Sequence, residues 1–349
     1  MLDVTRWLRR SPASRSVRIL IGTQAGDAAG IYLADYDAAR RVPGPARLAA
    51  ATGNPSCVIA GGRADLFHAV VETGGPDGGL VRSYVLRRAR LRLVGQCRSG
   101  GDSPCHLALA PDGTFLAVAN YGGGASAIDL GPDGGVAGAP RLLVPAAGTE
   151  AEGRSRPHWA SFRDGFLWIT DFGLDCVHVF PLAEWQARRT IPFPVGSGPR
   201  TLAWHPRLPL AYVVCERDNV IRVLETDRAG GAVIVAEHAT LPVGAPASAA
   251  AHVALDPEGT VLLASNRGHD SLAVFLVRPD GRLEAAGHAS SGGRHPRHFA
   301  FAPDGSALLV ANRDSDEVVA LRLQSGRPGE PVGATQVRGP AWVTFVIQP

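Results

Sequence analysis

The segment PCHLALAPDGTFLAVANYG, residues 104–122, recurs along the chain in recognisable form. Two close copies are AAHVALDPEGTVLLASNRG at residues 250–268 and HPRHFAFAPDGSALLVANRD at residues 295–314. In each copy, apolar residues alternate with other residues on both sides of an Asp-Gly or Glu-Gly pair. Such alternation indicates half-buried strands, and the Asp-Gly pair is typical of a tight hairpin turn. Each copy therefore predicts two antiparallel strands.

Weaker copies fill the intervals at residues 54–72, 157–173 and 198–217, and a truncated copy lies at 339–345. The copies begin roughly 40 to 50 residues apart, close to the period of a four-stranded propeller blade. The truncated copy lacks outer strands, which the segment VRILIGT at residues 17–23 and its successor can supply. Such closure removes the free sheet edge. The sequence thus predicts an all-β, seven-bladed β-propeller of four-stranded blades, closed by the N- and C-terminal strands. It forms a single domain over residues 17–349, preceded by an arm at residues 1–16.

Composition excludes several classes of protein. The 349 residues are 45% hydrophobic and 19% charged, with a net charge of +3. All 35 basic residues are Arg. This excludes chemistry based on Lys, and their scatter argues against nucleic acid as a partner. The five Cys show no zinc or disulfide spacing, and no apolar run approaches the roughly 18 residues of a membrane helix. We expect a cytoplasmic protein without metal, cofactor or membrane contact, as a monomer or weak homo-oligomer.

Equivalent positions of the copies should form rings around the central channel. Near the start of each copy the chain carries Ser56, His106, His158, Arg200, His252, Arg297 and Ala341. The end of the second strand carries Glu72, Asn120, Asp171, Glu216, Asn266 and Asn312, followed by Thr73, Tyr121, Phe172, Arg217, Arg267 and Arg313. Buried charges are costly unless paired, so these residues predict either a binding or catalytic site at the channel or a set of salt bridges between blades.

Other conspicuous side chains have simpler interpretations. Trp159, Trp168 and Trp204 follow the alternating pattern and are expected mostly in the core. His178 and His205 lie away from the two rings and are expected to be structural or exposed. No Gly-x-Ser-x-Gly motif is present, which argues against a serine hydrolase.

Several stretches together resemble one family. They are NPS (54–56), SPCHLALAPDG…VANYGGG (103–124), RPH (156–158), DFGLD (171–175), GPRTLAWHP (198–206), SNRGHDSLAVF (265–275) and HPRHFAFAPDGSALLVANRDSDEVV (295–319). In order and spacing they resemble the seven-bladed propeller lactonases, which include 6-phosphogluconolactonases and carboxy-cis,cis-muconate cyclases. The resemblance runs from residue 17 to residue 345. Two departures are Cys215-Glu216, where the family often has Asn-Glu, and Asp171-Phe172-Gly173, where it commonly has Asp-Leu-Gly.

The resemblance implies a catalytic set of His158, Arg200, Glu216 and Arg267 and a lactone hydrolase of the 6-phosphogluconolactonase type. Ester hydrolysis needs a base for the attacking water and positive charge for the oxyanion. His158 or Glu216 is the base, and we favour His158 with Glu216 as its partner, because nearby Arg opposes a raised Glu pKa. Arg200 and Arg267 would bind the carbonyl oxygen or an anionic substituent, so the lactone is expected to be anionic. The predicted substrate-binding residues are His106, Asn120, Tyr121, Asp171, His252, Asn266 and Arg297.

Three alternatives remain open from the sequence. A lactonising cyclase or pathway-specific lactonase could use the same groups. A non-catalytic propeller could present them to a ligand or partner. A calcium-dependent sugar lactonase would need several carboxylates on the axis.

Overall fold

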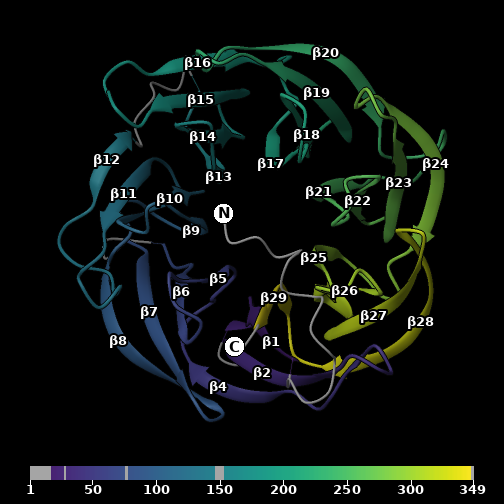
Figure 1. Cartoon of the computed structure of the whole chain (residues 1–349), viewed down its shortest axis with the longest axis horizontal. Coiled ribbons are helices and arrows are strands. Elements are labelled where there is room, and N and C mark those ends of the chain that lie inside the picture. Colours follow the sequence, from purple (N-terminus) through teal and green to yellow (C-terminus); the bar gives the residue numbers. More distant parts are fainter. Residues whose placement is uncertain (1–16, 27–28, 75–77, 146–152, 347–349) are drawn as a thin grey trace.

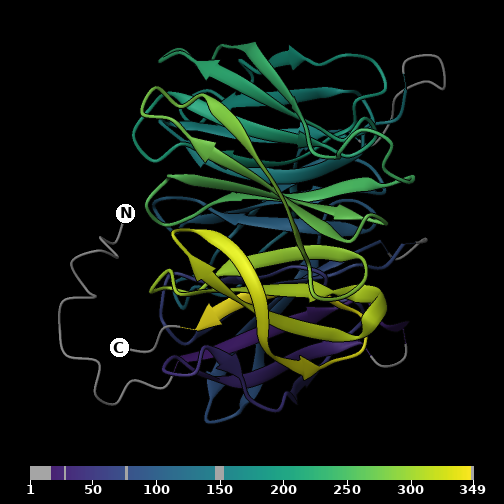
Figure 2. The same cartoon turned by 90° about the vertical axis from the view of Figure 1, so that its right-hand side faces the viewer.

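The computed structural model describes residues 17–26, 29–74, 78–145 and 153–346. The arm predicted at residues 1–16 lies outside the described residues. Within them the chain forms seven antiparallel sheets arranged in a ring around a central channel (Figure 1). Figure 2 shows the same ring from the side. The predicted all-β, seven-bladed propeller is confirmed.

The strands of the first three blades in chain order have the following bounds: β1 (Val17–Thr23), β2 (Gly30–Asp37), β3 (Val42–Pro43), β4 (Arg47–Ala51), β5 (Val58–Ala60), β6 (Leu66–Val71), β7 (Leu80–Arg87), β8 (Arg90–Arg98), β9 (Pro104–Leu109), β10 (Phe115–Asn120), β11 (Ala125–Asp129) and β12 (Arg141–Val144). The remaining elements are β13 (Pro157–Arg163), β14 (Phe166–Asp171), β15 (Cys176–Pro181), β16 (Arg189–Pro192), β17 (Pro199–Trp204), β18 (Leu210–Cys215), β19 (Val220–Thr226), β20 (Ala232–Ala239), β21 (Ala249–Leu255), β22 (Val261–Arg267), β23 (Ser271–Val277), β24 (Leu283–Ser290), β25 (Pro296–Phe301), β26 (Ala307–Asn312), the 3₁₀ helix η2 (Arg313–Ser315), β27 (Glu317–Gln324), β28 (Arg327–Gln336) and β29 (Pro340–Val346).

Six blades run outward from the channel in chain order, for example β9, β10, β11 and β12, whereas the closing blade runs from β29 to β1 and β2. The innermost strands are β5, β9, β13, β17, β21, β25 and β29 (Figure 1). The turns between the first two strands have the predicted chemistry. In one of them Gly113 has a φ of 74° and the Asp112 carboxylate accepts a hydrogen bond from the Thr114 amide. This region of φ favours glycine, which explains the recurring Asp-Gly pair.

The ring closes through its two terminal strands. The C-terminal strand β29 pairs antiparallel with β1, with Ile21 opposite Val343 and Arg18 opposite Val346. β1 then pairs with β2, and β2 with β3 and β4, which completes the seventh blade. The predicted closure is confirmed. In the described part of this blade, the C-terminal strand β29 is not left alone but is paired with β1.

Neighbouring blades pack face to face through apolar side chains. Tyr212 and Val214 of one blade, for example, share a cluster with Leu262 and Ala264 of the next. Burying one such Leu or Val contributes about 1.5–3 kcal/mol. The clusters between blades therefore make a rigid frame that holds the inner strands around the channel. Among the described residues, no helix is long and apolar enough to span a membrane.

Candidate active site

A β-bulge near the start of the inner strands decides which side chains face the channel. In β13, Pro157 pairs with Asp171 and Trp159 pairs with Thr170, so His158 is an extra residue. The same irregularity recurs in β9, β17, β21, β25 and β29. We call the extra residues, together with Ser56 of the remaining blade, the bulge level. They are Ser56, Cys105, His158, Arg200, Ala251, Arg297 and Ala341.

A second level lies one residue further along each inner strand, and most of its members are aromatic. It contains Cys57, His106, Trp159, Thr201, His252, His298 and Trp342, and we call it the aromatic level. The pocket at the centre of the ring is lined by members of both levels. His106 and His252 therefore lie one step below His158, Arg200 and Arg297, rather than in one ring with them.

A third level forms the mouth of the channel. The amides of Glu72, Tyr121, Phe172, Glu216 and Arg313 each donate to the carbonyl of the residue that precedes the first proline of an inner-strand segment. Gln24 makes the same bond in the closing blade, and Arg267 pairs with the corresponding Ala249. Glu216 is thus equivalent to Tyr121 and Arg267. The repeat pattern of the sequence predicts that Glu216 and Glu72 lie level with Asn120 and Asp171, and the structure places both one residue further along.

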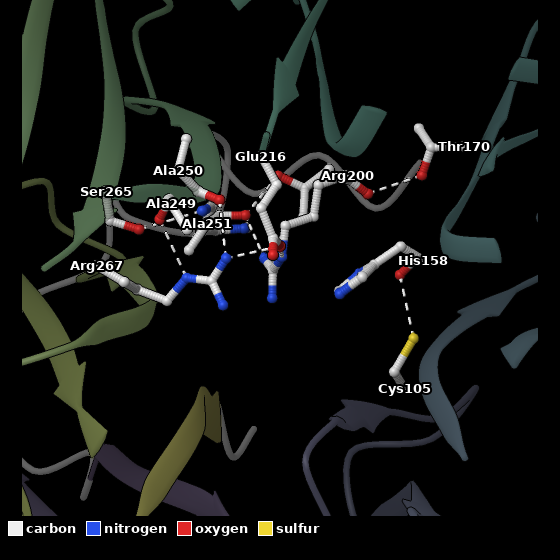
Figure 3. Close-up of polar contacts among 12 residues, drawn as sticks. Cys105, His158, Thr170, Arg200, Glu216, Ala249, Ala250, Ala251, Ser265 and Arg267 are labelled. Carbon is white, nitrogen blue, oxygen red and sulfur yellow. Dashed lines mark hydrogen bonds and ion pairs between the residues drawn. The ribbon is translucent and has the colours of Figure 1, made fainter. Parts of the chain in front are cut away.

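Glu216 holds two guanidinium groups across a blade boundary (Figure 3). Its Oε2 lies 2.6 Å from Nη2 of Arg267 and 2.8 Å from Nε of Arg200. The contact with Arg200 is an ion pair without hydrogen-bond alignment. Both guanidiniums are also fixed by the backbone of β21. Arg267 donates to the carbonyls of Ala249 and Ala250, each at 3.1 Å, and Arg200 donates to that of Ala251.

The charges of this cluster set its protonation. Burial by itself would raise the pKa of Glu216, but Arg200 and Arg267 outweigh it, so the pKa lies below its usual value. Burial and the neighbouring Arg267 lower the pKa of Arg200 to about 9, against the opposing effect of Glu216. At neutral pH the carboxylate is therefore ionised and both guanidiniums are charged. A carboxylate held in this way is a weak base and a strong anchor.

His158 lies beside this cluster, with its ring directed toward Arg200 and Glu216 in Figure 3. Burial, followed by the charges of Arg200 and Arg297, holds its pKa well below the usual value. Its Nδ1 is buried without a hydrogen-bond partner, and no hydrogen bond joins it to Glu216 among the described residues. The structure therefore pairs Glu216 with the two arginines, whereas the sequence analysis expected it to partner His158.

Of two further predicted residues, Arg297 lines the pocket and Tyr121 contacts one of its lining residues, His158. Arg297 lines the pocket from the bulge level and makes no hydrogen bond or ion pair with the residues that the structure describes. It adds a third positive charge beside Arg200 and Arg267, against the carboxylates of Glu216 and, at the mouth level, Glu72. Tyr121, at the mouth level, contacts the edge of the His158 ring with centroids 5.7 Å apart. This end of the channel is therefore electropositive.

Asn120, Asp171 and Asn266 have a different use from the one predicted. All three side chains are completely buried. Asn266 donates to the carbonyl of Thr240 at 2.8 Å, and Asn120 donates to that of Ser99 at 3.4 Å, so each holds the connection arriving from the preceding blade. Asp171 accepts hydrogen bonds from the Ser155 hydroxyl and from backbone amides. Because their side chains are completely buried among these contacts, we assign them a structural role.

The predictions for other aromatic and His residues are partly confirmed. His178 is buried against Asp171, and His205 accepts the amides of Arg207 and Leu208, so both are structural as predicted. Trp168 belongs to the core. Trp159, in contrast, faces the channel and stacks on His106, because the bulge before it reverses the side on which it lies.

His298 and Trp342 line the pocket and were missed by the sequence analysis. A signal for them was present, because both lie two positions after the first proline of their segments, as His106 and Trp159 do. No group of three or more His, Cys, Asp or Glu side chains is placed to hold a metal ion in the described parts of the chain.

The comparisons with known proteins agree with the fold. The family model for the seven-bladed β-propeller lactonases matches residues 18–345. The chain belongs to this lactonase family. The 6-phosphogluconolactonase of Bacillus subtilis strain 168 is 27% identical to this lactonase over 291 residues, which are 79% of this chain and 82% of that protein. That of Pectobacterium carotovorum is 30% identical over 224 residues, covering 61% of this chain and 65% of that one. Among solved structures, the periplasmic gluconolactonase of Pseudomonas aeruginosa superposes with a TM-score of 0.88 at 29% identity, covering 96% of this chain and all (100%) of that one.

The two departures from the family pattern fall at different depths in this lactonase. Cys215 is completely buried and belongs to an apolar cluster, so it fills the place that Asn120 and Asp171 occupy in other blades. Phe172 lies at the mouth level, where the guanidinium of Arg217 stands 4.0 Å above its ring. The first departure changes a blade connection, and the second shapes the entrance to the pocket.

Proposed function

We propose that the protein hydrolyses a sugar lactone that carries an anionic group, with 6-phosphogluconolactone as the leading substrate. The observation that carries this proposal is the group of three guanidiniums, Arg200, Arg267 and Arg297, at this end of the channel. Three guanidiniums against the two carboxylates of Glu216 and Glu72 leave a net positive charge, which suits an anionic substituent and the oxyanion formed during ester hydrolysis. The named 6-phosphogluconolactonase relatives support the choice of substrate.

In this mechanism His158 is the general base. Its imidazole is neutral at neutral pH, so it can accept a proton from the attacking water. The water attacks the lactone carbonyl, and the ring C–O bond then breaks, with a proton returning to the leaving hydroxyl. A bound anionic substrate would also make His158 a stronger base, because a nearby anion offsets the arginine charges that lower the pKa of His158.

Glu216 acts as a positioning residue. Its carboxylate already holds Arg200 and Arg267, so its lone pairs are engaged by cations. Arg200 and Arg267 then stabilise the oxyanion, because their guanidiniums are fixed before substrate arrives. Arg297, which has no protein partner among the described residues, binds the anionic substituent. His106, Tyr121 and His252 complete the proposed binding surface.

The experiment compares hydrolysis of fresh 6-phosphogluconolactone and gluconolactone, with EDTA present, by the wild type and His158→Ala. His238→Ala is the matched control, because His238 lies on the outer strand β20 away from the pocket. We expect turnover of the phosphorylated lactone to fall by about 10²-fold or more in His158→Ala and to persist in the control. Absence of wild-type turnover on both lactones would overturn the assignment and leave a carboxylated lactone or a binding protein. Loss of activity on adding EDTA would instead indicate a metal-dependent lactonase.

The cytoplasmic location and the oligomeric state expected from the sequence stay predictions. One structural relative is described as periplasmic, so localisation is best tested by fractionating cells that produce the full chain.

A further inference from the structure

Two His–Trp pairs occupy the aromatic level of the channel. The ring of His106 stacks on Trp159 with centroids 3.6 Å apart and an interplanar angle of 21°. His298 stacks on Trp342 at 3.8 Å and 22°. In both pairs the tryptophan comes from the next blade, so one arrangement occurs twice around the ring. Trp159 and Trp342 also contact each other, at 5.9 Å, which brings the two pairs together at the centre.

The backbone of the next blade fixes the orientation of each imidazole. Nδ1 of His106 accepts the amide hydrogen of Ala160 at 3.1 Å, and Nδ1 of His298 accepts that of Val343 at 3.3 Å. A ring nitrogen that accepts a hydrogen bond carries no proton, so the proton of a neutral imidazole must lie on Nε2. Both histidines are therefore set as Nε2–H donors.

These donors are uncharged. Burial holds the pKa of His106 and of His298 well below the usual value, and the neighbouring His252 and Arg200 act in the same direction. Neither Nε2 atom has a hydrogen-bond partner among the described residues, and neither is sealed from the channel. Both residues line the same pocket as His158 and Arg200.

The aromatic level is also the floor of the pocket. The volume that the centre of a water-sized sphere can occupy here is about 20 Å³, room for about one water molecule or one oxygen atom of a ligand. Trp159, His252 and His298 also line a second cavity further along the inner strands, so the rings separate the two spaces.

We propose that His106 and His298 are substrate-binding residues that donate Nε2–H hydrogen bonds to uncharged oxygen atoms of the lactone, its hydroxyl or ring oxygens. This inference rests on the proposed function, gives His106 a defined role and adds His298 to the site. The arginines then select the anionic group, and the two imidazoles select the position of neutral oxygens. A lactone that lacks the matching oxygen leaves a buried donor unpaired and binds more weakly.

The test uses two variants that separate the two nitrogens of His298. In His298→Asn the side-chain oxygen can still accept the Val343 amide hydrogen, but the Nε2–H donor is lost. In His298→Gln the donor is retained near its original place, and the acceptor is lost. We expect KM for the lactone to rise at least about fivefold more in His298→Asn than in His298→Gln. The melting temperature should fall more in His298→Gln than in His298→Asn, because only His298→Gln loses the acceptor for the Val343 amide. The same pair of substitutions at His238, on the outer strand, should show no such crossing.

A purely structural role for His298 would make His298→Asn the milder variant in both KM and melting temperature, and that result would overturn the proposal. A second measurement does not depend on turnover. Imidazole ¹H–¹⁵N spectra of the wild type at pH 7, assigned with the Asn variants of His106 and His298, should show neutral Nε2–H tautomers. An Nδ1–H tautomer or an imidazolium at either residue would refute the inference even if the protein is an active lactonase. If no lactone is hydrolysed but both tautomers are Nε2–H, the proposed function fails and the donor geometry stands.

Discussion

Glu216 and Arg267 come from neighbouring blades, and their side chains meet at 2.6 Å at the mouth of the channel. Glu216 follows β18, whereas Arg267 ends β22. The same carboxylate oxygen contacts Arg200, so one acidic group fixes two cations that would otherwise repel each other. The ion pairs are thus both a link between blades and part of the site.

Replacing this anchor should disable the site without removing any proposed base. In Glu216→Gln the two buried guanidiniums lose their counter-charge, and we expect kcat/KM for the lactone to fall by about 10²-fold or more. The matched control is Glu237→Gln, because Glu237 pairs with Arg222 on the outer strands. Steady-state kinetics of both variants check this. Wild-type kcat/KM in Glu216→Gln would contradict the anchoring role.

Arg297 should discriminate between charged and neutral lactones. Arg297→Met removes the guanidinium that has no protein partner among the described residues, so KM for 6-phosphogluconolactone should rise by roughly 10- to 100-fold. KM for gluconolactone, which has no phosphate, should change by less than about threefold. Arg92→Met, at an exposed position of β8, controls for net charge. An equal rise of KM for both lactones would place the phosphate elsewhere.

Stability should depend on pH through the buried histidines of the channel. Burial, reinforced by Arg200, lowers the pKa of His252 to about 3, and the pKa values of His106, His158 and His298 also lie well below the usual value. Below pH 6.5 the unfolded chain therefore binds protons that the folded chain excludes. Each such histidine then lowers the free energy of unfolding by about 1.4 kcal/mol per pH unit.

Melting temperature should accordingly fall as the pH decreases from about 6.5 to 4.5. Glu216 and Asp171, whose pKa values are also lowered, act in the same direction but at lower pH. His252→Phe keeps a ring at this position and should show a shallower decrease. Thermal melts at several pH values measure both, and a constant melting temperature from pH 7 to 5 would refute the prediction.

The closing blade should be sensitive to a single methyl group at Gly22. A Cβ atom at Gly22 would lie 2.1 Å from the Pro55 carbonyl oxygen, which belongs to the segment entering the next blade. Gly22→Ala therefore forces backbone to move, and we expect a destabilisation of about 1–3 kcal/mol and a lower melting temperature. Gly62→Ala is the control, because a Cβ there meets nothing within 4 Å. Equal melting temperatures for the two variants would contradict the expectation.

The fold was predictable because its signals are local. Alternating residues on either side of Asp112-Gly113 indicate a hairpin, and the repeat of that hairpin fixes the number of blades and their closure. The depth of individual site residues was not predicted, since a bulge adds one residue to the strand without changing the alternation nearby. His158, Arg200 and Ala341 occupy the same bulge position, so the sequence carries no common residue that marks it.

The position of Glu216 along its strand also could not be predicted from the sequence. Four other blades have Asn or Asp at this place of the second strand, but here Cys215 occupies it. The repeat pattern therefore aligns the next residue, Glu216, with those Asn and Asp residues. Only the backbone bond from the Glu216 amide to the Gly198 carbonyl reveals that Glu216 belongs with Arg267. The contact between Arg200 and Glu216 could not be predicted from the sequence either, because it joins a residue of an inner strand to one at the mouth level.

The bulges also allow side chains that face the channel to be replaced with little effect on the sheets. Each extra residue projects from a strand whose pairing continues on both sides, so the pairing itself does not depend on the identity of its side chain. Four of the seven positions carry small side chains: Ser56, Cys105, Ala251 and Ala341. Single replacements at these four positions, beside an existing His and two Arg, would change which ligands fit the channel while the pairing of the seven sheets stays as it is.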